Sequence, residues 1–118
     1  MIIMDKIIIV EGTSDKRKVK DIVREPVEII CTNGTIGIAK IDDLIEDLFE
    51  KDVYILVDAD TSGEKIRKLF RKELPEAEHI FINKMYREVA AAPSQHIASV
   101  LLQANIDVYP EFLDMRMK

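Results

Sequence analysis

The sequence predicts an α/β domain in which a mainly parallel sheet of about four strands carries helices on both faces. Short runs rich in β-branched apolar residues recur along the chain, and segments with apolar residues at helical spacing lie between them. Continuous apolar runs are typical of strands buried on both faces, and strands that alternate with helices build parallel sheets through right-handed crossovers. We therefore expect three layers, with the sheet between two layers of helices.

The expected elements follow from these two patterns. Strands are predicted at 7–10, 27–31, 53–57 and 80–82. Three helices between them should bury the apolar positions Val19, Ile22 and Val23, then Ile41, Leu44, Ile45, Leu48 and Phe49, then Ile66, Leu69 and Phe70. A fourth helix should follow Pro93 and Ser94, end near Asn105 and bury Ile97, Val100, Leu101 and Ala104.

Polar residues at the predicted helix starts supply candidate caps. Thr13 or Ser14 is expected to cap the first helix, and Thr61 with Glu64 has the spacing of a capping box for the third. Each helix is therefore expected to begin directly after the loop that follows its strand.

Length and composition indicate one domain over residues 1–118, with a C-terminal helix and tail at 94–118. The chain is 47% hydrophobic, which is enough for one core, and its net charge of −5 argues against an unspecific basic nucleic-acid binder. Cys31 is the single cysteine, which favours a reducing compartment, and the cytoplasm is the default. Asp5 and Lys6 interrupt the first apolar stretch, so neither a signal peptide nor a membrane segment is expected.

Acidic residues follow two strands that are expected to be central. Glu11 comes directly after the first strand, and Asp58 and Asp60 come directly after the third. Ligands of open parallel sheets bind beyond the carboxyl ends of the strands, so we expect these three carboxylates to gather there. Each acid has a simpler structural interpretation as a turn or cap residue, and Asp60 could merely begin the turn into the third helix.

Carboxylates brought together repel one another unless a cation lies between them. Mg²⁺ prefers hard oxygen ligands and is commonly held by a few carboxylates together with substrate phosphates. Zinc is disfavoured, because the chain has two histidines and one cysteine. The sequence therefore predicts a magnesium site made by Glu11, Asp58 and Asp60, with Mn²⁺ as the alternative ion.

The segments IIIVEGTSDKRKVK and LVDADTSGEKIRKLF resemble the two signature motifs of the Toprim family, and the resemblance covers about residues 6–83. The run from Asp58 to Arg67 is similar to that of the Toprim ribonucleases that mature ribosomal RNA, and the domain is also similar to the Toprim domains of bacterial primases. The resemblance implies a Rossmann-like three-layer fold. It further implies that Glu11 acts as general acid or base and that Asp58 and Asp60 coordinate magnesium.

Further site residues are suggested by the same resemblance and by charge. Gly12 and Gly63 would allow close backbone approach, and the loop Thr32, Asn33 and Gly34 would face the site. Basic residues that could contact phosphates include Lys16, Lys65, Arg67 and Lys84, although charged faces are also ordinary on exposed helices.

Three functions are compatible with these residues. The first is magnesium-dependent phosphodiester processing of RNA or DNA, most simply hydrolysis by a nuclease. The second is a non-catalytic Toprim module that binds nucleic acid directly or through a protein partner. The third is a phosphoacceptor receiver domain, which fits less well because Gly12, and no second acid, follows Glu11.

Overall fold

The computed structural model describes residues 5–33 and 38–113, without the side chains of 38–41. In this part the chain forms a four-stranded parallel sheet in the order β2-β1-β3-β4. The strands are β1 (Lys6–Val10), β2 (Val27–Cys31), β3 (Asp52–Leu56) and β4 (Glu78–Ile80), and the helices are α1 (Thr13–Ile22), α2 (Ile38–Leu48), α3 (Thr61–Glu73) and α4 (Ser94–Gln103), with the short turns η1 (Lys84–Tyr86) and η2 (Pro110–Phe112). The predicted α/β class and parallel sheet are confirmed.

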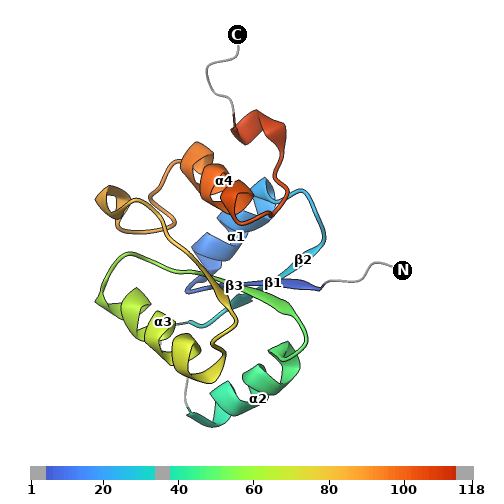
Figure 1. Cartoon of the computed structure of the whole chain (residues 1–118). Helices are drawn as coiled ribbons and strands as arrows, with labels where there is room; N and C mark the ends of the chain where they lie inside the picture. Colours follow the sequence, from blue (N-terminus) through green and yellow to red (C-terminus); the bar gives the residue numbers. More distant parts are fainter. Residues whose placement is uncertain (1–4, 34–37, 114–118) are drawn as a thin grey trace.

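Helices α1 and α4 cover one face of the sheet, and α2 and α3 cover the other (Figure 1). Ile8 and Val10 of β1 pack in one cluster with residues of α1 and α4, whereas Ile7 and Ile9 pack in a second cluster with residues of α2 and α3. Successive residues of a strand point to opposite faces, so a strand buried on both sides needs apolar residues throughout. This requirement explains the unbroken apolar runs in the sequence.

The chain changes direction across the sheet at β1. The connection through α1 leads from β1 to β2 on one side, and β3 pairs with the other side of β1. The carboxyl ends of β1 and β3 therefore lie side by side at the topological switch point, where open α/β sheets bind ligands. Glu11 follows β1 directly, and Asp58 lies in the loop after β3.

The fourth strand lies two residues earlier than predicted. β4 spans Glu78–Ile80, and its Ile80 pairs with Leu56 of β3. Ile82, predicted to end the strand, lies beyond it but is only 5% exposed. An apolar run predicts which residues are buried but not which are paired in a strand. Here Ile82 is buried although the last paired residue is Ile80.

The caps of α1 and α3 also differ from the prediction. Asp60, rather than Thr61, caps α3, because its Oδ1 accepts a hydrogen bond from Gly63 N at 2.8 Å. Gly12, rather than Thr13 or Ser14, is the N-cap of α1.

One residue of the predicted apolar stripe on α2 is not in the core. Phe49 is 74% exposed, because α2 ends at Leu48 and the helical spacing stops there. Ile41, from the same predicted stripe, lies outside the side chains that the structure describes. None of the described helices is long and apolar enough to cross a membrane.

A buried arginine joins α3 to the ends of two strands. Arg67 is 3% exposed and donates hydrogen bonds to the carbonyl oxygens of Ile55 at 3.3 Å, Ile80 at 2.7 Å and Val57 at 3.5 Å. Burial lowers the pKa of Arg67 to about 10, so the guanidinium remains protonated at neutral pH. Carbonyl acceptors thus compensate a charge that would otherwise be costly to bury.

The two phenylalanines Phe70 and Phe49 allow a test of this core. Phe70 is fully buried, so Phe70→Ala should lower the free energy of unfolding by about 3–5 kcal/mol in urea denaturation. Phe49→Ala is the matched control and should change it by no more than about 0.5 kcal/mol. Similar losses in the two variants would contradict the described packing.

Candidate functional site

The carboxylate of Glu11 links the end of β1 to the loop after β3. Its Oε1 accepts a hydrogen bond from the backbone N–H of Asp58 at 2.8 Å, and its Oε2 accepts one from Ser62 Oγ at 3.3 Å. Glu11 therefore contacts both the loop that follows β3 and the first turn of α3.

Asp58 is held from the other side by the segment that follows η1. Its Oδ1 accepts a hydrogen bond from Val89 N at 2.8 Å, and the next residue, Ala59, donates its N–H to Arg87 O at 2.7 Å. Arg87 has a φ of 62°, which non-glycine residues adopt only at a cost of about 1–3 kcal/mol. The segment 87–89, which fixes the position of Asp58, thus contains a strained backbone conformation at Arg87.

Asp60 and Gly63 bring the start of α3 close to Asp58. A Cβ added at Gly63 would lie 2.0 Å from the carbonyl oxygen of Asp58, so only glycine allows this approach. Gly12 is different, because a Cβ there would make an ordinary contact of 3.8 Å with Asp15. A close approach of neighbouring backbone is thus found at Gly63, and the role expected of Gly12 stays a prediction.

A further carboxylate at the site was not predicted. Asp15 is 6% exposed, and its Oδ2 accepts a hydrogen bond from Gly12 N at 3.1 Å. Burial raises the pKa of Asp15 above its usual value. Its place three residues after Gly12 is the spacing from which an acid reaches back to the N-cap N–H, and this was the available sequence signal.

Burial disfavours the ionised forms of three of these carboxylates, Glu11, Asp15 and Asp58. Burial raises the pKa of Asp58 to about 6, with further contributions from the negative charges of Glu11, Asp15 and Asp60, while the Val89 N–H opposes the shift. Burial also raises the pKa of Glu11 against the effect of the Asp58 N–H. Proton uptake, or a cation, would relieve this repulsion.

A cavity of about 640 Å³ opens beside these residues. Asp58 and Asp60 line it together with Arg71, Lys84 and the ring of Phe81. Its volume lies within the range of small-ligand sites, about 300–1,000 Å³. The described lining does not include Glu11. The Glu11 oxygens accept hydrogen bonds from Asp58 N and Ser62 Oγ.

The arrangement supports a two-carboxylate metal site better than the predicted three-carboxylate one. Across residues 5–33 and 38–113, no three His, Cys, Asp or Glu side chains are placed so that they could hold a metal ion. Asp58 and Asp60 nevertheless line one cavity, and magnesium often takes one or two carboxylates, with waters and phosphates completing its shell. The hard carboxylate oxygens of this pair fit such an ion.

The predicted loop after β2 extends the sheet next to Glu11. Thr32 N donates to Val10 O at 2.9 Å, and Asn33 N donates to Glu11 O at 2.7 Å. Thr32 Oγ1 is buried and has no hydrogen-bond partner among the described residues. Gly34 lies outside the described residues.

The predicted phosphate-contacting residues fall into two groups. Arg67 and Lys84 line the cavity, although the Arg67 guanidinium is already bonded to strand carbonyls. Lys16 on α1 and Lys65 on α3 are exposed and do not belong to the described lining. Phosphate contact by any of the four stays a prediction.

The fold and the motif positions agree with the family that the chain matches. The family model of the Toprim domain matches residues 6–85, and the chain belongs to this family. The span includes both the Glu11 and the Asp58 segments.

Three relatives place the chain more closely. It is 52% identical to the uncharacterized protein YusF of Bacillus subtilis (strain 168), over 98% of this chain and 79% of that protein. The structure of a small TOPRIM domain protein from Bacillus stearothermophilus has a TM-score of 0.92 and 53% identity, with 98% of this chain and 99% of that chain covered. Ribonuclease M5 1 of Ligilactobacillus salivarius (strain UCC118) is 35% identical over 67% of this chain, which spans 42% of the ribonuclease.

The raised pKa of Asp58 predicts a pH dependence of metal-free stability. A carboxyl whose pKa is higher in the folded chain binds its proton more tightly there, so its contribution to stability falls as the pH rises from about 4 to about 6. Asp58→Asn keeps an acceptor for Val89 N but carries no charge. In EDTA its melting temperature should exceed that of the wild type at pH 7, and the difference should shrink towards pH 4. If the two melting temperatures differ by the same amount at pH 4 and pH 7, the raised pKa of Asp58 is contradicted.

Proposed function

We propose that this protein is a magnesium-dependent nuclease that hydrolyses phosphodiester bonds in RNA or DNA. The observation that carries the proposal is the pair Asp58 and Asp60, next to Glu11 at the switch point of the sheet and in a cavity that also contains Arg71 and Lys84. The similarity to ribonuclease M5 1 supports the same reaction class.

The carboxylates Asp58 and Asp60 would hold Mg²⁺ in the cavity that they line. When bound, Mg²⁺ polarises the phosphodiester and stabilises negative charge on the leaving oxygen. Val89 N keeps Asp58 oriented, and Gly63 N keeps Asp60 oriented, so both side chains are positioned before substrate arrives.

Glu11 would exchange a proton with the attacking water or the leaving oxygen. Its Oε1 is held by Asp58 N, whereas its Oε2 accepts only a longer contact from the exposed Ser62 hydroxyl, so Oε2 is the oxygen that can exchange a proton. The raised pKa of Glu11 brings its protonation closer to neutral pH, which suits a general acid or base.

Charge on the cavity wall would orient the substrate. Lys84 and Arg71 line the same cavity as the acids, and Arg71 is paired with the exposed Glu64 at 3.1 Å. Surface pairs of this kind contribute little stability, so a phosphate can replace the carboxylate partner at small cost. These cations would hold the phosphate backbone without reading its sequence.

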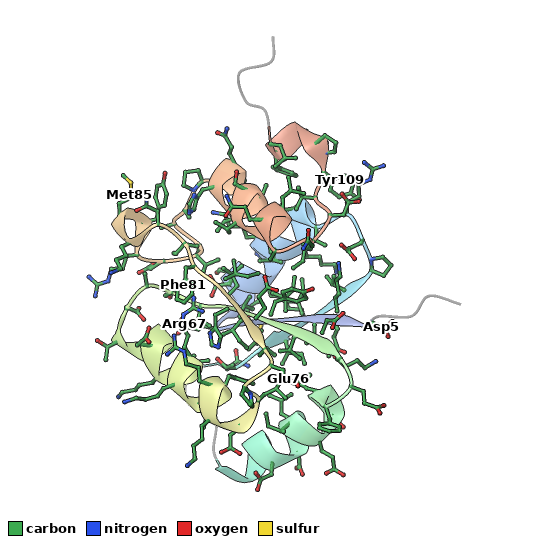
Figure 2. The ribbon with its side chains drawn as sticks, in the orientation of Figure 1. Asp5, Arg67, Glu76, Phe81, Met85 and Tyr109 are labelled. Carbon is green, nitrogen blue, oxygen red and sulfur yellow. The ribbon has the colours of Figure 1, made fainter. Side chains whose placement is uncertain are left out.

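Cleavage assays with isosteric variants test the proposal. Glu11→Gln and Asp58→Asn should each lower magnesium-dependent cleavage of labelled RNA and DNA by at least about 100-fold, because a proton-transfer group or a metal ligand is lost. Glu76→Gln and Asp5→Asn are matched controls away from the site (Figure 2) and should cleave like the wild type. Undiminished cleavage by both site variants would refute the mechanism.

Magnesium binding can be measured without any substrate. Millimolar Mg²⁺ should raise the melting temperature of the wild type, because an ion that binds only the folded chain stabilises it by mass action. The rise should be lost in Asp58→Asn and retained in Asp5→Asn. An equal rise in all three proteins would place the ion elsewhere.

A second function is a non-catalytic nucleic-acid-binding module. It is favoured by the absence, within the described residues, of three acids arranged for a metal, and by the chain spanning 42% of ribonuclease M5 1. Binding of oligonucleotides without cleavage, across single-stranded and duplex RNA and DNA with magnesium present, would support this function over the first.

A further inference from the structure

An exposed aromatic ring stands at the rim of the acidic cavity. Phe81 follows β4 by one residue, is 57% exposed, and lines the same cavity as Asp58 and Asp60. Its solvent exposure is unfavourable for a phenylalanine, whereas neighbouring Ile80 and Ile82 are buried. The ring covers the buried Arg67 guanidinium, 4.0 Å from its centroid, yet more than half of the side chain's surface remains exposed at the cavity.

We propose that Phe81 is a stacking platform for one base of an unpaired nucleic-acid segment whose backbone lies at Asp58 and Asp60. This assignment rests on the proposed function, and it narrows the substrate class to single-stranded RNA or DNA, or to an unpaired region of a folded nucleic acid. In a duplex, both faces of each internal base are already stacked, so the ring would have nothing to cover.

The ring is held before any ligand binds. Arg67 lies beside Phe81 (Figure 2), with its guanidinium carbon 4.0 Å from the ring centroid. Arg67 itself donates a hydrogen bond to Ile80 O at 2.7 Å. His79 stacks at a centroid distance of 6.4 Å with an interplanar angle of 26°. A ring already fixed in this way loses little conformational freedom when a base covers its exposed surface.

The surrounding charges fit a nucleotide rather than an apolar ligand. Lys84, Arg71 and Phe81 all line the same cavity. The cavity therefore presents an aromatic ring for a base and cations for phosphates. This combination of stacking rings and a basic backbone track is typical of single-strand binding sites. Phe49 is also exposed, at 74%, but it lines a different pocket. That pocket includes Asp52 and Val53, the first residues of β3, so it lies near the amino end of this strand, away from the acids.

A tryptophan reporter tests the stacking directly. The chain contains no tryptophan, so Phe81→Trp introduces a single indole whose fluorescence is quenched when a base stacks on it. In a Glu11→Gln background, which removes the proposed proton-exchanging group but keeps Asp58 and Asp60, a single-stranded oligonucleotide of about ten nucleotides should quench this fluorescence saturably. Phe49→Trp in the same background is the control and should not be quenched.

The outcomes separate the possibilities. Quenching of Phe81→Trp by the single strand, and not by a duplex of the same sequence, supports the assignment. No quenching, equal quenching by the duplex, or equal quenching of Phe49→Trp would overturn it.

Affinity measurements give an independent result. Phe81→Ala should weaken binding of the fluorescent single strand, measured by anisotropy, about 5- to 150-fold, whereas Phe81→Tyr keeps the ring and should bind close to the wild type. Unchanged affinity of Phe81→Ala would refute the platform even if cleavage is observed. Quenching with no cleavage by the wild type would instead refute the nuclease and leave the platform in place.

Discussion

The crowding of negative charge at the carboxyl ends of β1 and β3 is the constraint to which the surrounding backbone is fitted. Each of the carboxylates there accepts a hydrogen bond from a different backbone N–H: Glu11 from Asp58, Asp15 from Gly12, Asp58 from Val89 and Asp60 from Gly63. These donors come from the β3 exit, the two helix starts and the segment after η1. They lower the cost of the charges only in part, because the pKa of Asp58 remains raised to about 6.

Most of the architecture follows from apolar patterning. Strand and helix alternation predicted the parallel sheet, because both faces of every strand had to be covered. The extent of β4 could not be read in this way, since Ile82 is buried by packing without being paired. Phe49 was assigned to the core by its spacing, but spacing does not reveal where a helix stops.

The candidate site was predictable in its acids and less so in what holds them. Strand-end position predicted that Glu11 and Asp58 are neighbours, and the Glu11 carboxylate does accept a hydrogen bond from Asp58 N. The donor from Val89, by contrast, is an ordinary backbone group with no sequence signature. Arg67 was interpreted as a surface cation, yet it falls on the helical stripe of Gly63, Ile66 and Phe70, all of which are buried. A charged residue on the buried stripe of a helix therefore predicts a side chain that makes hydrogen bonds inside the protein.

The segment after η1 has a consequence for how this domain can be divided. The Toprim match ends at residue 85, but the N–H that orients Asp58 belongs to Val89, and Lys18 of α1 donates to the carbonyl oxygens of Ala90 and Ala92. A chimera cut at the family boundary would keep every acidic motif residue while removing the groups that orient one of them. The smallest unit able to present an ordered site therefore extends past the recognisable motifs, and sequence matching alone would draw its edge too early.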